Sequence, residues 1–357
     1  MTILMPIVKS GWRPMPDSWL VRPVAAADLP SVLDLAQSLG TGLTTLPADE
    51  YALAGKIERS LASFAGIADR SAAQYLLVLE DRERGQVLGT AGVYSHVGSP
   101  YGFFSYKTLR LIQRSEALGC GCEIEMLALA NDYTGATEVG TLTVWPELKG
   151  SGAGRLLARS RYMLVAAFPD LFSPLLMAEM RGWQDEENRS PFWESVGARF
   201  FSMDFAAADK MSAVRGSDFI AELLPKHPIH INLLPDEARE VIGKPHRDSA
   251  PALAMLLREG FRFEGYVDVF DAGPQVHCNR DQVATVRRSR EGEIHLAANN
   301  QALTENLLIA SRKLNQFRVV AASASLDEAG LSVGQAALTR LGVEPGETVR
   351  FAAFHGD

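Results

Sequence analysis

The stretch ELKGSGAGRLLARSR, from Glu147 to Arg161, constrains this chain more than any other segment. Gly150, Gly152 and Gly154 stand at alternate positions directly before an apolar run with helical spacing. The first backbone N–H groups of a helix have no internal partner, and they carry the positive end of the helix dipole. Glycines at such a turn let the backbone approach a phosphate closely. The turn therefore predicts an anionic ligand.

The spacing excludes two kinds of nucleotide site. A dinucleotide-binding turn needs G-x-G-x-x-G, and here Arg155 stands where the last glycine would be. A P-loop needs Lys-Ser or Lys-Thr after the glycines, and neither follows them. The turn resembles that of the acyl-CoA N-acyltransferase (GNAT) superfamily, R/Q-x-x-G-x-G/A, with Lys149 in the basic position. Gly150, Gly152 and Gly154 would then approach the CoA pyrophosphate, and Lys149 and Arg155 would add charge. The alternative is structural, because a helix packed closely on a sheet also needs small residues.

Composition and charge narrow the classes of partner. The chain has 357 residues, 47% of them hydrophobic, with 35 basic and 43 acidic residues and a formal charge of -8. No run of Lys and Arg would follow a phosphate backbone or an anionic membrane, so we expect no nucleic acid and no membrane as partner. The N-terminus lacks a signal-peptide pattern, and no stretch reaches the ~18 apolar residues of a membrane span. These features predict a cytoplasmic protein.

The three cysteines predict neither a disulfide framework nor a metal site. Cys120 and Cys122 are one residue apart with no second ligand pair at zinc-finger spacing, and Cys278 stands alone. We expect free thiols, no metal and no permanently bound cofactor.

The first part of the chain alternates strand and helix patterns. WLVRPV from Trp19 has the composition of a short strand, and Asp28 is expected to cap the helix that follows. A second helix is predicted over 48–64. QYLLVLED from Gln74 and VLGTAGVYSHV from Val87 are separated by a polar turn, which predicts a hairpin.

The segments around the glycine turn are predicted to be strand, helix, strand and short helix. TEVGTLTVW from Thr137 is a strand in which Gly140 is a bulge candidate, and a bent strand would leave backbone groups for the pantetheine arm of CoA. Leu142 and Val144 are the candidate main-chain contacts. A helix over 151–168, a strand over 174–183 and a short helix, PFWESVGARF, that Gly197 ends would follow.

The sequence that follows shows no regular helix or strand pattern until a predicted helix over 251–258, which is followed by the predicted strand FRFEGYVDVFD. From about Gln282 the strand candidates EIHLAA, FRVVAAS and TVRFAAF surround a helix near 333–340. Runs of strands and helices over one sheet indicate an α+β architecture. We expect a leader (1–19), a main domain (20–281, with its core to about 205 and an extension over 206–281) and a small, mainly β C-terminal subdomain (282–357).

Several long collinear motifs resemble the arginine N-succinyltransferase family. They include LANDYTGATEVGTLTV, GRLLARSRYMLVAAF, FIAELLPKHPI, VIGKPH and GFRFEGYVDVFDAGP, and the resemblance runs from about Leu20 to Arg290 and more weakly to the end. It implies a GNAT-like fold with a mixed, largely antiparallel sheet flanked by helices. It also implies transfer of a succinyl group from succinyl-CoA, the co-substrate, to the α-amino group of L-arginine or ornithine in arginine degradation.

The resemblance further implies an oligomer, made of one chain or of this chain with a paralogous subunit. The alternative function that we keep open is a non-catalytic or weakly catalytic subunit, which has the fold but mainly assembles with a paralogue.

Attack of an amine on a thioester requires a group that handles a proton, and histidine titrates nearest to neutral pH. His246 lies in a loop with Pro and Gly before a helix, and the family resemblance carries its catalytic histidine, in the I-G-x-x-H segment, onto this residue. His227 is the second choice, because Lys226 beside it would disfavour the imidazolium. Tyr133 is a weaker candidate to protonate the leaving thiolate.

The acceptor and the succinyl group each carry charges that the protein must recognise. The acidic candidates for the guanidinium are Asp132, Glu138, Glu179 and Asp204. The basic candidates for the carboxylates are Arg181 and Lys226, of which an arginine is the better geometric match. Asp132, Glu179 and Arg181 are the predicted substrate-binding residues, and the spacing does not choose among them.

Overall fold

The computed structural model describes residues 15–38, 45–201, 203–205, 207, 223–328 and 330–354. Its strands are β1 (Trp19–Pro23), β2 (Gln74–Asp81), β3 (Gln86–Tyr94), β4 (Ser105–Ser115), β5 (Cys120–Ala130), β6 (Thr137–Val144), β7 (Leu175–Glu179), β8 (Ile229–His230), β9 (Arg262–Val267), β10 (Pro274–Asn279), β11 (Arg290–Leu296), β12 (Glu305–Ala310), β13 (Val319–Asp327), β14 (Gly330–Val333) and β15 (Thr348–Ala353). Its α-helices are α1 (Leu29–Ser38), α2 (Glu50–Phe64), α3 (Ala153–Ala167), α4 (Pro191–Ser195), α5 (Gly197–Phe201), α8 (Asp236–Arg239), α9 (Ala250–Arg258), α10 (Ala284–Arg288) and α11 (Gln335–Leu341).

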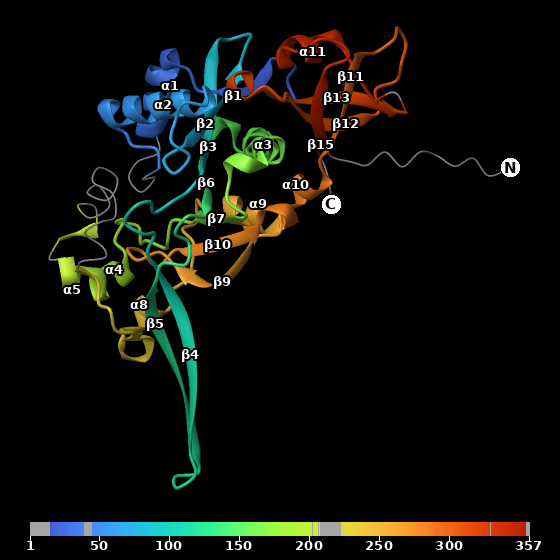
Figure 1. Ribbon diagram of the computed structural model, residues 1–357. Coiled ribbons are helices and arrows are strands. Elements are labelled where there is room, and N and C mark those ends of the chain that lie inside the picture. The colour runs from blue at the N-terminus through green and yellow to red at the C-terminus, as the bar shows by residue number, and fades with distance from the viewer. Residues whose placement is uncertain are drawn as a thin grey trace.

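The described strands form one continuous sheet with helices packed against it (Figure 1). Their order is β12-β15-β11-β14-β13-β1-β2-β3-β6-β7-β10-β9-β4-β5-β8. Within the described residues, β6–β7 and β11–β14 are the parallel pairs, so the sheet is mixed and largely antiparallel. The predicted α+β class is confirmed, as is the β2–β3 hairpin.

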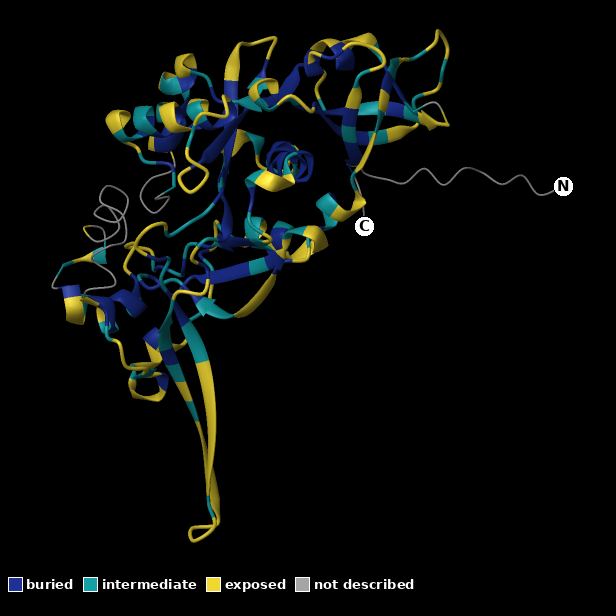
Figure 2. Ribbon diagram, in the orientation of Figure 1, coloured by how far each residue is buried: buried dark blue, intermediate teal, exposed yellow. Residues whose placement is uncertain are grey.

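Strand β2 is a continuous apolar run because helices cover both of its faces. Tyr75 and Leu77 belong to the hydrophobic cluster that contains α3, whereas Leu76 and Val78 pack with α1 and α2. Side chains alternate between the faces of a sheet, so a strand that is covered on both sides needs apolar residues at every position. Figure 2 shows the buried centre that results. α3, which begins at the glycine turn, is thereby fixed against the middle of the sheet.

The C-terminal strands extend the sheet past β1. β13 pairs with β1 at Val319 and Val21. Part of the apolar residues of β11 to β15 form a separate cluster with α11, which includes Leu338 and Leu341, and the others join the cluster that contains α3. α11 ends at Gly342, whose φ of 64° is the left-handed conformation common after helices. The expected strands and helix of this part are present, and β12 and β14 are additional.

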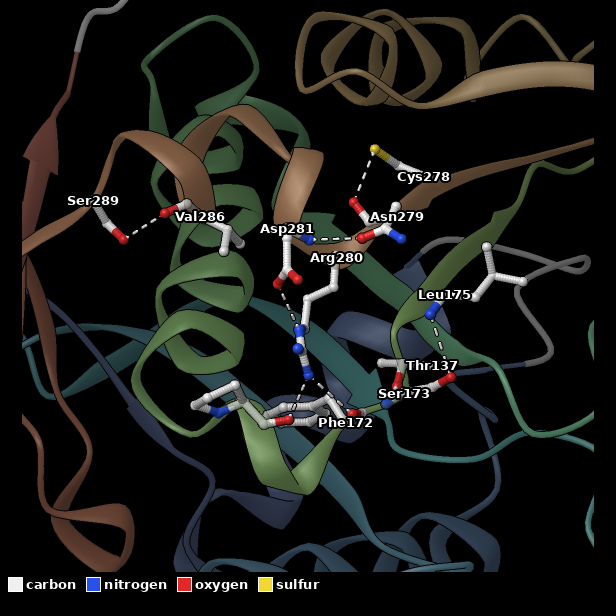
Figure 3. Close-up of polar contacts among 11 residues, drawn as sticks. Thr137, Phe172, Ser173, Leu175, Cys278, Asn279, Arg280, Asp281, Val286 and Ser289 are labelled. Carbon is white, nitrogen blue, oxygen red and sulfur yellow. Dashed lines mark hydrogen bonds and ion pairs between the residues drawn. The ribbon is translucent and has the colours of Figure 1, made fainter.

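Polar contacts tie the segment after β10 to the end of α3 (Figure 3). Arg280 donates from Nη1 to the carbonyl oxygens of Pro169, at 2.8 Å, and Phe172, at 3.4 Å. Its Nε donates to Asp281 Oδ1 at 3.0 Å, and Asn279 Oδ1 accepts the Asp281 backbone N–H at 3.1 Å. These bonds link the segment that follows α3 to the segment that follows β10.

The sequence patterns do not reveal the long hairpin of β4 and β5, which projects from the body (Figure 1). Its outer half is exposed, with Leu111 41% and Ile112 61% accessible (Figure 2). Its apolar and polar residues alternate, since Leu109 and Leu111 lie opposite Met126 and Ile124, but Leu109 and Leu111 remain exposed instead of packing on the main body.

Two local predictions are wrong. Asp28 does not cap α1 through a helix N–H; its carboxylate accepts the Ala25 N–H at 2.7 Å and binds Arg22. Gly197 does not end the helix of PFWESVGARF, because α4 ends at Ser195 and α5 begins at Gly197. A Cβ at Gly197 would lie 2.2 Å from the Trp193 ring, so close packing explains this glycine.

Candidate active site

The site is built around a strand that separates from its neighbour. β6 pairs in parallel with β7 only at Thr137 and Glu138, and its later residues pair with β3. A bulge follows Gly140, since Gly92 pairs with Gly140 but Thr90 pairs with Thr143. The predicted bulge is therefore present, in the residues directly after Gly140. On the side away from β3, no described strand lies beside β6 after Glu138, so backbone groups of this segment face a cavity.

The glycine turn follows at the end of β6 and opens α3. Gly150 and Gly152 have φ values of 82° and 96°, the left-handed region that favours glycine. A Cβ added at Gly150 or Gly154 would meet no atom within 4 Å, so open space lies in front of both residues. A Cβ at Gly152 would lie 2.4 Å from Met15 Cε, so this glycine is needed by the turn itself.

A cavity of about 750 Å³ joins the glycine turn, the open edge of β6 and the loop that carries His246. Of the predicted site residues, it is lined by Leu142, Val144, Lys149, Gly150, Gly154, Glu179, Arg181 and His246. The structure thus brings together residues that lie more than a hundred positions apart in the chain. A cavity of this size fits the class of ligand-binding pockets that hold small organic molecules.

His246 is 7% exposed and is fixed by the main chain on two sides. Its backbone N–H donates to Arg181 O at 2.7 Å, and the Asp248 N–H donates to its Nδ1 at 3.2 Å. Burial, and then the nearby Arg181 charge, lower the pKa of His246 below its ordinary 6.5, although Asp248 raises it in part. The ring is therefore neutral at pH 7. Since Nδ1 accepts a hydrogen bond, the proton of the neutral ring is on Nε2.

The cavity is also lined by buried carboxyl groups. Glu138 is 7% exposed, and burial raises its pKa to about 7, with Lys56 and Arg161 opposing the shift. Burial, and then the Asp268 and Glu138 charges, raise the pKa of Glu179 well above its ordinary value. Carboxyl groups that titrate near neutral pH in a cavity are typical of proton transfer and of cation binding.

Some predicted residues lie elsewhere. Gly152 and Arg155 do not line the cavity, because Met15 covers the first and the side chain of the second is exposed on α3. Asp132 is exposed and accepts a 2.6 Å hydrogen bond from the Tyr266 hydroxyl outside the cavity. Tyr133 is buried, with its hydroxyl 2.7 Å from His277 Nδ1, and it does not line the cavity either.

The remaining candidates are also outside the cavity. His227 and Lys226 are exposed in the segment before β8. Asp204 is exposed and accepts the Ala207 N–H at 2.7 Å. The geometry therefore favours His246 over His227 for any chemistry in the cavity.

The sequence analysis missed Asp268 and Asp271, which line the cavity from the turn between β9 and β10. Both Asp271 oxygens accept backbone N–H groups, from Gly182 at 2.7 Å and Gly273 at 2.8 Å, and Asp268 Oδ1 accepts the Phe270 N–H at 2.7 Å. Two acids within the otherwise apolar VDVFDAG could have pointed to this turn.

Two other features are absent from the described residues. No helix of the described ranges has the length and apolar character that crossing a bilayer requires. Within the same ranges, no group of three or more His, Cys, Asp or Glu side chains is arranged to hold a metal ion.

Comparison with known proteins gives a consistent result. Residues 19–285 match the family model described as arginine N-succinyltransferase beta subunit, and residues 290–353 match the model of its C-terminal domain. Arginine N-succinyltransferase subunit beta of Pseudomonas aeruginosa is 41% identical over 331 residues, which cover 93% of this chain and 97% of the relative. Arginine N-succinyltransferase of Escherichia coli is 40% identical, with 93% and 96% covered.

A solved structure is also similar along nearly the whole chain. It is the arginine/ornithine succinyltransferase subunit AI from Pseudomonas aeruginosa, with a TM-score of 0.85 and 30% sequence identity. The similarity covers 95% of this chain and 99% of that one.

Proposed function

The chain belongs to the arginine N-succinyltransferase family, and from this premise we propose how its cavity transfers a succinyl group from succinyl-CoA to the α-amino group of L-arginine. The chain is a CoA-dependent acyltransferase of this family. The observation that carries the proposed mechanism is that the glycine turn, the open edge of β6 and His246 line one cavity.

The donor is proposed to lie along β6 and the start of α3. Gly150 and Gly154 have open space in front of them, and Lys149 precedes them, which supports binding of the CoA pyrophosphate at the helix N-terminus. The main chain of Leu142 and Val144 would pair with the pantetheine arm. β6 and β7 separate after Glu138, and the glycine turn leads from β6 into α3, which covers the sheet. These features support our proposal that the fold is GNAT-like.

Replacement of Gly154 by valine is expected to raise the KM for succinyl-CoA at least roughly tenfold, because the side chain would fill the space of the phosphates. Gly154 lies within α3 and its Cβ would meet no protein atom. The melting temperature should therefore stay the same or rise, since glycine is a poor helix former. Steady-state kinetics and a melting curve measure both effects.

The matched control is Gly154→Ala, which should show a smaller rise in KM. An unchanged CoA affinity by calorimetry in the valine variant would remove the pyrophosphate from this position. Gly152→Val is a poor test, because the left-handed φ and the contact with Met15 would distort the turn.

His246 is proposed to stabilise the oxyanion that forms when the amine attacks the thioester. The neutral ring carries its proton on Nε2, because Nδ1 accepts the Asp248 N–H. In the addition step the C–N bond forms and the carbonyl oxygen becomes an oxyanion, to which Nε2–H donates. When the C–S bond breaks, the second proton of the amine passes to the CoA thiolate, so the products are the amide and the free thiol.

Glu138 is proposed to accept the first proton of the α-ammonium group. Its carboxyl group lines the cavity next to the β6 segment that would hold the thioester arm, and its pKa of about 7 suits a general base. This role replaces the guanidinium-binding role considered for Glu138 from the sequence.

Arg181 is proposed to bind the carboxylate of the succinyl group. It lies in the cavity wall next to His246, where its Nη2 donates to Gln184 Oε1. Arg181→Ala should lower kcat/KM for succinyl-CoA by roughly 10- to 100-fold, as expected for a lost charge-assisted hydrogen bond. Residual turnover of acetyl-CoA should change far less, because acetyl-CoA has no carboxylate. An equal loss with both donors would contradict this role.

The test of the function is release of CoA thiol by the purified chain, with succinyl-CoA and L-arginine both present. Thiol release that needs both compounds, with formation of succinylarginine detected by mass spectrometry, supports the enzyme. The alternative, a non-catalytic or weakly catalytic subunit, predicts little release by the chain alone and more on addition of a paralogous subunit.

Assembly into an oligomer, with a second copy or with a paralogue, remains a proposal. The relatives are named as subunits, and the β4–β5 hairpin presents an apolar face, since Leu109 pairs with Met126 and Leu111 with Ile124. An isolated two-stranded hairpin is marginally stable in water, so a partner surface would stabilise it. A native mass equal to one chain would count against self-assembly.

We also propose the predicted division of the chain, with a main domain over 20–281 and a C-terminal subdomain over 282–357. Separate family models for 19–285 and 290–353 support it. The cytoplasmic location stays a prediction.

A further inference from the structure

Two polar side chains meet at the acidic wall of the cavity. β7 and β10 are antiparallel neighbours, and Gln275 lies directly opposite Glu179. Directly opposed residues project to the same face of a sheet. Gln275 Nε2 donates to Glu179 Oε1 at 2.5 Å, and Glu179 lines the cavity. Glu179 therefore lines the cavity, and Gln275, which is fully buried, lies behind it and holds its carboxyl group.

The amide of Gln275 is only half satisfied. The residue is fully buried, and its Oε1 has no hydrogen-bond partner in the described part of the chain. A buried carbonyl oxygen without a donor is unfavourable, so the position of Gln275 needs an explanation. Its hydrogen bond to Glu179, which orients that carboxyl group, provides one.

The charges around this pair favour a cationic donor. Asp268 and Asp271 from the β9–β10 turn and Glu138 from β6 are the charged groups with the largest effect on Glu179, and all are acidic. Asp271 is committed to the backbone N–H groups of Gly182 and Gly273. Among the described residues, the one hydrogen-bond donor to the Glu179 carboxyl group is Gln275. Glu179 is thus the group available to a ligand.

We propose that Glu179 and Gln275 form the subsite for the guanidinium group of the acceptor, an inference that rests on the proposed function. A guanidinium has five N–H donors in a planar fork, which can form two parallel hydrogen bonds with the Glu179 carboxylate that Gln275 orients. The ammonium group of ornithine has no such fork and satisfies fewer of these acceptors. The pair therefore determines a preference for arginine over ornithine.

The test compares arginine and ornithine as acceptors for the full chain and for two variants of similar side-chain volume. Gln275→Leu removes the amide, and Glu179→Gln removes the charge. Each should raise the KM for arginine by roughly 10- to 100-fold and leave the KM for succinyl-CoA within about twofold. The ratio of kcat/KM for arginine to that for ornithine should fall in both variants. Glu179→Asp keeps the charge and should lie between wild type and Glu179→Gln.

Arginine binding provides a second readout. Burial and the neighbouring acids raise the pKa of Glu179 and so favour its protonated form in the empty cavity, whereas a bound guanidinium favours the carboxylate. Calorimetry of arginine binding in buffers of different ionisation enthalpy should therefore show proton release by the wild type and less by Glu179→Gln.

The outcomes separate this inference from the proposed function. If the wild type succinylates neither acceptor, the proposed function is wrong. If it succinylates arginine, but both variants keep the wild-type KM and the wild-type preference, the subsite is wrong. A fall in kcat that is equal for the two acceptors, with both KM values unchanged, would also overturn it. A melting curve for Gln275→Leu shows whether the fold is intact, and Glu179→Gln alone remains decisive if it is not.

Discussion

Replacement of His246 by alanine is expected to lower kcat for succinyl transfer by roughly 10²- to 10⁴-fold, the range for groups that move protons or stabilise an oxyanion. The Asp248 N–H donates to Nδ1 of the neutral ring, so the proton is on Nε2 of a side chain that lines the cavity. The alanine variant loses this donor and gains space for water. The KM for succinyl-CoA should change little, because the glycine turn binds the phosphates elsewhere in the cavity. Steady-state kinetics at pH 7 and above measures the effect.

Two variants control the His246 result. His246→Gln keeps an N–H donor near the position of Nε2, so it should retain more activity than the alanine variant if donation is the role. His227→Ala should behave as wild type, since His227 is exposed and does not line the cavity. A large fall in kcat for His227→Ala, with His246→Ala near wild type, would transfer the role to His227.

The pH dependence distinguishes donation from base catalysis at His246. Burial and Arg181 lower its pKa below 6.5, so the ring loses its proton at a lower pH than usual and is neutral through the physiological range. Asp248 acts in the opposite direction, so Asp248→Asn should lower the pKa of His246 further. If His246 were the base, Asp248→Asn would move the acid limb of kcat/KM downward.

The strands and the helix around the site can be predicted from the sequence, because each depends on residues that are close together in the chain. The apolar runs that form β2 and β6, and the glycines that open α3, follow from backbone geometry and helix dipoles. The meeting of the glycine turn with His246 was not predictable by spacing, since it depends on how distant strands pair in the sheet. The resemblance to a family supplied His246 before the fold was known.

Two other features do not follow from local sequence patterns, each for a different reason. Asp132 was a reasonable acid for a guanidinium, yet its position after β5 places it beside Tyr266 and outside the cavity. Gln275 has no sequence signal at all, because a single amide in a strand acquires meaning only from Glu179 on the neighbouring strand. The β4–β5 hairpin was missed although its apolar and polar residues alternate.

Replacement of Glu138 by glutamine is expected to lower kcat/KM at pH 7 by roughly 10²- to 10⁴-fold, the range for a lost general base. Glutamine keeps the size of the side chain but cannot accept the proton of the α-ammonium group. In the wild type the acid limb of the profile should lie at about 7, because Glu138 is protonated and inactive below its pKa. In Glu138→Gln this limb should disappear. Activity should instead rise with pH as arginine deprotonates in solution, so that the deficit shrinks in alkaline buffer.

Lys56 provides the matched control for this assignment. Its positive charge lowers the pKa of Glu138, and burial lowers its own pKa to about 8. Lys56→Met removes the charge, so the pKa of Glu138 should rise and the acid limb should move to higher pH, with the rate above the limb nearly unchanged. A limb that stays in place in Lys56→Met and persists in Glu138→Gln would show that another group accepts the proton. A downward shift of the acid limb in Asp248→Asn would then identify that group as His246. Asp248 affects the pKa of His246, whereas Lys56 affects the pKa of Glu138.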